Sequence, residues 1–101
     1  MRRGIIDQAM DYLADQIVVE MKTLATNVSV SANSTTSAYT IPTKSGYKIA
    51  AVTPIVSGAY YGHYFATITH TSNVPSTIYF KNTHSSAHTN SFYVYITYIK
   101  E

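Results

Sequence analysis

The chain contains no cysteine, and this absence removes several classes of site. Without thiols it can form no disulfide framework, offers no thiolate nucleophile and cannot hold a cysteine-ligated zinc ion. It also lacks an apolar run of about 18 residues, so no helix is expected to span a membrane. The start carries two arginines, as a signal peptide would, but Asp7, Asp11 and Asp15 interrupt any apolar segment. We read it as mature sequence, or as the cut end of a longer chain.

Charge is scarce as well. Charged residues make up 12% of the 101 residues, against about 25% in an average soluble domain. The net charge is only +2 and the seven basic residues are scattered. Nucleic-acid phosphates require clustered Lys and Arg, so no nucleic-acid partner is indicated.

Acidic residues are the most restricted group, and their positions exclude much catalytic chemistry. The five acids are Asp7, Asp11, Asp15, Glu20 and Glu101, so no carboxylate lies between Met21 and Lys100. A glycosidase needs two facing carboxylic groups, a Ser-His-Asp triad needs its orienting acid, and calcium or magnesium needs anionic ligands. We therefore expect no enzymatic activity and no bound cofactor or metal.

The remaining composition is that of a folded protein. Hydrophobic residues account for 46% of the chain and ten residues are tyrosine, whereas disordered segments are charged and poor in aromatics. The length of 101 residues leaves room for one domain.

Residues 5–25 show the periodicity of a helix. Apolar side chains recur at spacings of three and four, at Ile6, Met10, Leu13, Ile17, Met21 and Leu24. Asp7 and Asp11 lie near the start and Lys22 near the end, as the helix dipole favours. We predict an N-terminal amphipathic helix over residues 1–25, followed by a β head domain over residues 26–101.

A helix of this length needs a partner for its apolar stripe. It either lies across the body of its own domain or associates with the helices of other subunits, because residues 6, 10, 13 and 17 also read as a/d positions. Glu20 occupies the next heptad position, which argues against a long regular coil but not against a short bundle. In the second interpretation the six apolar side chains form an interface between subunits.

After Thr26 the pattern changes to period two, and β-branched and aromatic residues dominate. Residues 26–31 alternate, and further strand-like segments cover 37–41, 47–56, 59–69, 77–81 and 92–100. Turn-rich stretches separate them. This spacing predicts a mainly β fold, with an antiparallel sandwich or a small barrel after the helix. Of the two, we expect a jelly-roll-like β-sandwich head. Pro54 makes its segment an edge strand or a bulged one.

The last predicted strand is apolar or aromatic on both faces. Alternation divides it into two sets, Phe92, Val94, Ile96 and Tyr98 on one face and Tyr93, Tyr95 and Ile99 on the other. A strand with one solvated face would be polar on that face. The strand therefore either lies centrally with something packed on both sides, or its second face, with Tyr93 and Tyr95, forms a subunit interface.

Four histidines, His63, His70, His84 and His88, are the remaining candidates for chemistry. His84 and His88 would share one face of a helix, a spacing that suits a metal pair, but residues 81–90 read as a loop. The first interpretation is polar loop histidines that contact water or backbone. Contact with a ligand is one alternative, and a metal held on a symmetry axis by histidines of three subunits is another.

Residues 60–65, Tyr-Tyr-Gly-His-Tyr-Phe, form the densest aromatic cluster. Their rings would either fill a core or form a recognition surface, because tyrosine combines a rigid apolar face with a hydroxyl. Such a surface suits sugars, which present C–H faces and hydroxyls. Gly58 and Gly62 would allow a bend or a close backbone approach. The candidate receptor-binding residues are Tyr60, Tyr61, His63, Tyr64, His84, His88 and Asn90.

Several segments carry a resemblance. They are residues 24–34, 39–42 (Tyr-Thr-Ile-Pro), 45–52 (Ser-Gly-Tyr-Lys-Ile-Ala-Ala-Val), 78–82 (Ile-Tyr-Phe-Lys-Asn) and 94–100 (Val-Tyr-Ile-Thr-Tyr-Ile-Lys). With the preceding helix, this layout resembles the C-terminal head domains of tail-fibre and baseplate receptor-binding proteins of bacteriophages, especially those of Gram-positive hosts. The shared features are a helical neck, a Gly-Tyr strand opening, an asparagine after a late strand and a final strand ending in Tyr-Ile-Lys.

The resemblance implies a homotrimer, with the helices bundled on the three-fold axis and the β heads side by side. It implies a virion protein of the tail fibre or baseplate that attaches, outside the cell, to a host-surface receptor such as a cell-wall saccharide. Its other partners would be tail or baseplate proteins, with neither nucleic acid nor membrane insertion expected. Two alternatives stay open: a purely structural virion component, such as a decoration or collar protein, and an enzyme such as a depolymerase fragment.

Overall fold

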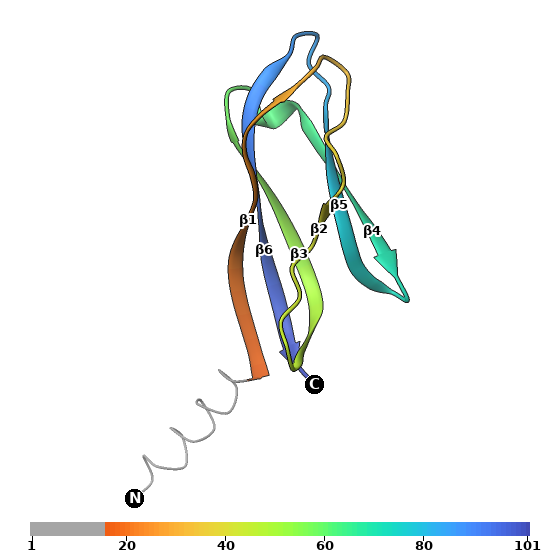
Figure 1. Ribbon diagram of the computed structural model, residues 1–101. Coiled ribbons are helices and arrows are strands. Elements are labelled where there is room, and N and C mark those ends of the chain that lie inside the picture. Colours follow the sequence, from red (N-terminus) through yellow and green to blue (C-terminus); the bar gives the residue numbers. More distant parts are fainter. Residues whose placement is uncertain (1–15) are drawn as a thin grey trace, which may run out of the picture.

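The computed structural model describes residues 16–101, so Ile6, Met10 and Leu13 of the predicted helix lie outside the described residues. The described chain consists of six strands and one short 3₁₀ turn, η1 (Figure 1). Their bounds are β1 Ile17–Val30, β2 Tyr39–Thr40, β3 Tyr47–Gly58, η1 Tyr61–His63, β4 Tyr64–Thr71, β5 Val74–Asn82 and β6 His88–Lys100. No helix in this part of the chain is long and apolar enough to cross a membrane.

The strands form two antiparallel sheets, with the orders β1-β6-β3 and β2-β5-β4. The first strand pairs with the last, Ile17 opposite Ile99, and the second pairs with the last but one, Tyr39 opposite Ile78. Figure 1 shows the two sheets facing each other along the length of β6 and β5. The predicted mainly β, antiparallel fold is therefore confirmed.

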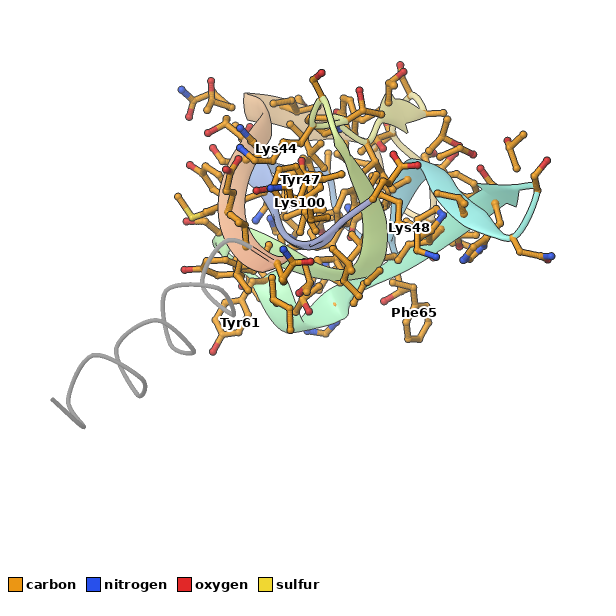
Figure 2. All side chains as sticks on the ribbon, turned by 90° about the horizontal axis from the view of Figure 1, so that it is seen from below. Lys44, Tyr47, Lys48, Tyr61, Phe65 and Lys100 are labelled. Atoms are coloured by element: carbon orange, nitrogen blue, oxygen red, sulfur yellow. The ribbon has the colours of Figure 1, made fainter. Side chains whose placement is uncertain are left out.

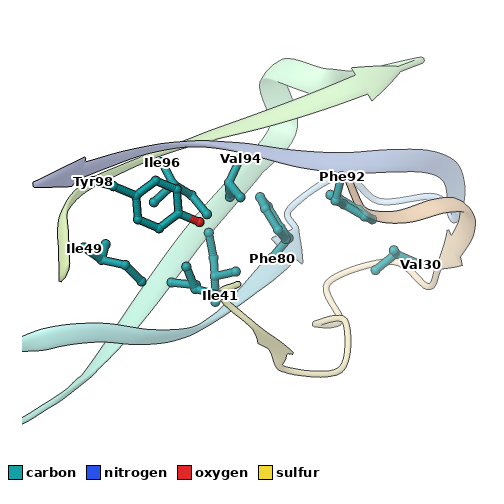
Figure 3. Close-up of a cluster of buried hydrophobic side chains, with 9 residues drawn as sticks. Val30, Ile41, Ile49, Phe80, Phe92, Val94, Ile96 and Tyr98 are labelled. Carbon is teal, nitrogen blue, oxygen red and sulfur yellow. The ribbon is translucent and has the colours of Figure 1, made fainter. Parts of the chain in front are cut away.

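The hydrophobic core lies between the two sheets (Figure 3). Its buried side chains come from both sheets and from the β2–β3 connection, and are Val30, Ile41, Ile49, Ile78, Phe80, Phe92, Val94, Ile96 and Tyr98. Phe80 of β5 stacks on Phe92 of β6 with ring centroids 4.5 Å apart, which joins the sheets. The Tyr98 hydroxyl donates a hydrogen bond of 2.8 Å to the Pro42 carbonyl, so the polar end of this buried ring is also satisfied.

Strand β6 is central in its sheet, between β1 and β3. One of its two predicted faces, with Phe92, Val94, Ile96 and Tyr98, is fully buried. The described residues leave its other face more open, with Tyr95 44% and Ile99 37% exposed. The division of the strand into two faces is thus confirmed, and the second face is left largely open.

The predicted helix is wrong over residues 17–25, which lie in β1. A spacing of four residues is even, so Ile17 and Met21 share a face in a strand as well as in a helix. Leu24 falls on the opposite face, where it packs against the core. Pairing with β6 decides between the two structures, because it gives hydrogen-bond partners to the β1 backbone groups that face β6.

Three other expected boundaries also shift. The strand expected over residues 59–69 begins only at Tyr64, because residues 59–63 form a turn and η1. The strand expected from Thr77 begins at Val74, and His88 to Asn90, expected in a loop, belong to β6. Pro54 does lie on an edge strand, β3, while the bulge of that strand falls between Ile49 and Ala51.

Candidate functional site

Four aromatic side chains meet at the end of the domain where β3 and β5 finish and β6 begins, at the top of Figure 1. We call this set the tip cluster: Tyr60, His63, His84 and His88. The Tyr60 ring centroid lies 4.2 Å from that of His88 and 4.6 Å from that of His84. His84 in turn lies 4.6 Å from His88 and 4.9 Å from His63. Residues 21 or more positions apart in the sequence thus form one ring-lined surface.

A sharp turn after β3 brings Tyr60 and His63 to this place. Gly58 has φ +113°, and a Cβ there would lie 2.9 Å from the Asn90 side-chain nitrogen. Tyr60 adopts the left-handed conformation, with φ 58°, and its carbonyl accepts the His63 N–H at 3.0 Å. The glycine expected to allow a close approach is therefore Gly58. Gly62 has open space around it and no positive φ.

The buried side-chain amide of Asn90, on β6, fixes this turn by hydrogen bonds. Its Nδ2 donates to the carbonyls of Ser57 and Ala59, at 3.1 and 2.9 Å. Its Oδ1 accepts the Tyr64 hydroxyl at 2.7 Å, and burial raises the pKa of that hydroxyl. Asn90 and Tyr64 therefore act as supports beneath the tip cluster.

A second buried amide, Asn82, holds the β5–β6 loop that carries His84. Its Nδ2 donates to the Val30 carbonyl at 3.1 Å and to the Ser86 carbonyl at 3.0 Å, and its Oδ1 accepts the His84 N–H at 2.9 Å. The same loop is tied to η1, because Thr83 donates to the His63 carbonyl through its N–H, at 2.9 Å, and through its hydroxyl. Both halves of the tip cluster are thus fastened to each other.

The two loop histidines are joined through their ring nitrogens. His84 Nδ1 accepts the Ser86 backbone N–H at 3.0 Å and lies 3.2 Å from His88 Nε2. Since a backbone N–H can only donate, His84 Nδ1 is unprotonated and His88 Nε2 carries the hydrogen. Partial burial lowers the pKa of His84, and the nearby His88 and His63 lower it further. The Ser86 hydrogen bond therefore holds His84 in the form with an unprotonated Nδ1.

This geometry suits hydrogen bonding better than metal binding. Ser86 N–H already occupies the direction of the His84 Nδ1 lone pair. Within residues 16–101, no group of three or more His, Cys, Asp or Glu side chains is placed to hold a metal ion. The alternative of a metal shared by three subunits gains no support from these contacts.

The predicted receptor-binding residues thus separate into three groups. Tyr60, His63, His84 and His88 form the tip cluster, and Tyr64 and Asn90 lie beneath it. Tyr61 is 68% exposed and projects from the ribbon in Figure 2. The sequence did not point to Asn82 and Ser86, which hold the β5–β6 loop in place. The signal for Asn82 was its position as an asparagine at the end of an apolar strand.

The predicted trimer-interface residues also separate. Ile17, Met21, Tyr93 and Tyr95 share the outer face of the β1-β6-β3 sheet, as their pairing shows, whereas Leu24 faces the core. This outer face also carries Val19, 60% exposed, beside Ile17 at 51% and Met21 at 54%. The β3 strand adds Ala51 and Ile55, opposite Thr97 and Tyr93. The face is largely apolar, with Thr23, Thr53 and Thr97 among its side chains. A strand and not a helix supplies its β1 part.

A separate cavity of about 350 Å³ lies at the opposite end of the domain. Its lining comes from the β2–β3 connection, the start of β3 and the β4–β5 hairpin, and includes Ile41, Tyr47, Lys48 and Val74. Figure 2, viewed from this end, labels Tyr47 and Lys48 of this lining. The cavity brings together no set of titratable side chains comparable with the tip cluster.

No protein-family model, curated protein or solved structure matches the chain. The function is therefore argued from the two surfaces described above, the tip cluster and the outer face of the β1-β6-β3 sheet.

Proposed function

We propose that this protein is the receptor-binding head of a bacteriophage tail fibre or baseplate, a virion protein that attaches to a host cell surface without catalysis. The observation that carries the proposal is the tip cluster, which gathers one tyrosine and three histidines on an exposed end of the domain. The layout of the sequence, with its Gly-Tyr strand opening and final Tyr-Ile-Lys, agrees with this assignment.

A cell-wall saccharide is the receptor class that fits this chemistry. Tyr60 is 51% and Tyr61 68% exposed, so apolar ring faces are open to the C–H faces of a sugar. The imidazole nitrogens beside them can form hydrogen bonds with sugar hydroxyls. Glu20 and Glu101, the described carboxylates, lie elsewhere: Glu20 pairs with Lys22 and Lys44, and the Glu101 N–H bonds Gly46. Binding without hydrolysis fits this arrangement.

The head is proposed to act as a homotrimer, with the outer face of the β1-β6-β3 sheet as its subunit interface. Soluble proteins rarely expose apolar patches beyond a few hundred Å², and larger patches mark interaction sites. Ile17, Val19, Met21 and Tyr95 are each more than two-fifths exposed on this face. The first strand pairs with the last, and the second strand pairs with the last but one. This order also fits a jelly roll with fewer strands, the fold expected for such heads.

Retention of the labelled protein on bacterial cells and on purified cell-wall saccharide tests the attachment role. The variant Tyr60→Asn removes the ring while keeping a residue that tolerates the left-handed backbone. We expect it to lose at least about tenfold in binding, a change of about 1.4 kcal/mol. The matched control is Phe65→Ala, because Phe65 is a 70% exposed ring on β4 that points away from the domain in Figure 2.

The outcomes separate the candidate functions. Failure of the wild-type protein to bind any candidate surface favours the purely structural virion role. Loss of binding in the Phe65 variant, but not in the Tyr60 variant, moves the receptor site to β4. Release of reducing ends from a surface polysaccharide overturns the non-catalytic assignment.

A further inference from the structure

We propose that His84 is a pH-sensitive switch, which we call the latch. Its unprotonated ring holds the β5–β6 loop in the binding conformation at neutral pH, and its protonation on acidification releases the loop. The inference concerns regulation of the tip cluster, so its consequence for receptor binding rests on the proposed function. The latch itself is a property of the loop and can be measured without any receptor.

The latch follows from the hydrogen bonds at one nitrogen atom. His84 Nδ1 receives the Ser86 N–H at 3.0 Å, and His88 Nε2 lies 3.2 Å from the same atom. Imidazole Nδ1 has one lone pair, so both donors depend on its being unprotonated. The neutral His84 ring then carries its hydrogen on Nε2. A second proton can bind only at Nδ1. Once bound, it takes up the lone pair, and the Ser86 and His88 N–H groups then lose their acceptor.

His88 responds differently to acid, which makes His84 the switching residue. The hydrogen that His88 offers sits on Nε2, and its Nδ1 is the atom left to accept a proton. A protonated His88 can therefore still donate to His84. A positive charge on His88 opposes protonation of His84, in keeping with the lowering effect of His88 on the pKa of His84.

Residues 16–101 supply no counter-charge close to a protonated His84. The groups that face it are His88 of β6, His63 of η1 and the ring of Tyr60. Lys81, at the end of β5, is paired with Phe65 on the outer face of the other sheet. The described carboxylates lie elsewhere, and Glu20 forms ion pairs with two lysines. The Tyr60 ring attracts a cation, but it replaces neither of the two lost hydrogen bonds.

Opening of the latch stays local. Asn82 keeps its bond to the Val30 carbonyl, and Thr83 keeps its bonds to the His63 carbonyl. What changes is the position of Ser86 and of the two imidazole rings. The pKa of His84 is lowered by partial burial and by its histidine neighbours, so the closed loop has its full stability above pH of about 6.5 and loses it as the pH falls.

Nuclear magnetic resonance of the full chain tests the latch. At pH 7.5 the ring nitrogen shifts of His84 should identify an unprotonated Nδ1. On acidification the Ser86 amide signal should move together with the His84 ring, with a midpoint below about 6.5. His88→Ala removes one donor and one neighbouring charge, so it should raise that midpoint. His84→Gln, which cannot take up a proton, should abolish the movement, while His70→Gln on β4 should leave it unchanged.

Two results would overturn the latch: a protonated Nδ1 on His84 at pH 7.5, or a Ser86 amide that does not move as His84 titrates. Saccharide binding is measured separately at pH 7.5 and 5.5, where uptake of one coupled proton with a midpoint below about 6.5 predicts a loss that does not exceed about tenfold. Equal binding at both pH values, with a moving Ser86 amide, refutes the regulatory role alone. A chain that binds no surface at either pH refutes the attachment role and leaves the loop measurement valid.

Discussion

The buried amide of Asn82 ties three segments together, and its replacement by alanine should destabilise the domain strongly. The side chain is 0% exposed. It bonds the end of β1 through the Val30 carbonyl, and the β5–β6 loop through the Ser86 carbonyl and the His84 N–H. Alanine leaves all three backbone groups without these partners.

The magnitude follows from the number of bonds and from their burial. An amide nitrogen has two hydrogens, so the third contact, 3.4 Å to the Ser31 carbonyl, adds little. The other three bonds contribute a net of about 1 kcal/mol each. The Val30 bond is buried, and an unpaired buried carbonyl costs about 1 kcal/mol more. We expect the free energy of unfolding to fall by about 3–4 kcal/mol.

Urea unfolding followed by tyrosine fluorescence and circular dichroism measures this change. All variants are compared at one protein concentration, because the stability of an oligomer depends on concentration. Asn82→Asp is the matched variant: it keeps the size and the acceptor for the His84 N–H, but its carboxylate cannot donate to the carbonyls. It should be at least as unstable as Asn82→Ala at neutral pH. A loss below about 1 kcal/mol in Asn82→Ala would refute the view that this amide organises the tip.

Three further substitutions test other parts of the structure. Gly58→Ala should lower the free energy of unfolding by about 2–3 kcal/mol, because it combines a strained φ of +113° with a contact of 2.9 Å to the Asn90 amide. Tyr64→Phe should cost about 1 kcal/mol in the same assay, because it removes the 2.7 Å hydrogen bond to Asn90. Val19→Lys places a charge on the outer face of the β1-β6-β3 sheet, so light scattering should show the mass falling from three chains to one chain of 11.2 kDa.

Each of these has a control elsewhere in the chain. Gly46→Ala has a φ of +81° and open space around it, so the difference between the two glycine variants isolates the contact with Asn90. Tyr79→Phe, on β5, controls for hydroxyl removal, and equal losses in both tyrosine variants would contradict the role of the Asn90 bond. Thr67→Lys, on β4, should leave the mass unchanged. A wild-type mass near one chain, or a Val19→Lys protein that stays associated, rules out this face as the interface.

Local patterns in the sequence determined much of this fold. Alternation with a period of two, and the turns between segments, predicted an antiparallel β domain, which the two sheets confirm. The division of β6 into two faces was predicted residue by residue, because alternation needs no knowledge of the partner strand. Pro54 marked an edge strand correctly, since a residue without an N–H cannot serve a central ladder.

Contacts between distant residues decided what the local patterns left ambiguous. Residues 17–25 carry apolar spacings that fit a helix, and the ladder between Ile17–Val30 and β6 makes them a strand. The meeting of His63 with His84 and His88 depends on the turn after Gly58 and on two buried asparagines. The sequence alone determined which side chains were available for recognition. Only the tertiary structure placed them together, because the hydrogen bonds that position them join residues far apart in the chain.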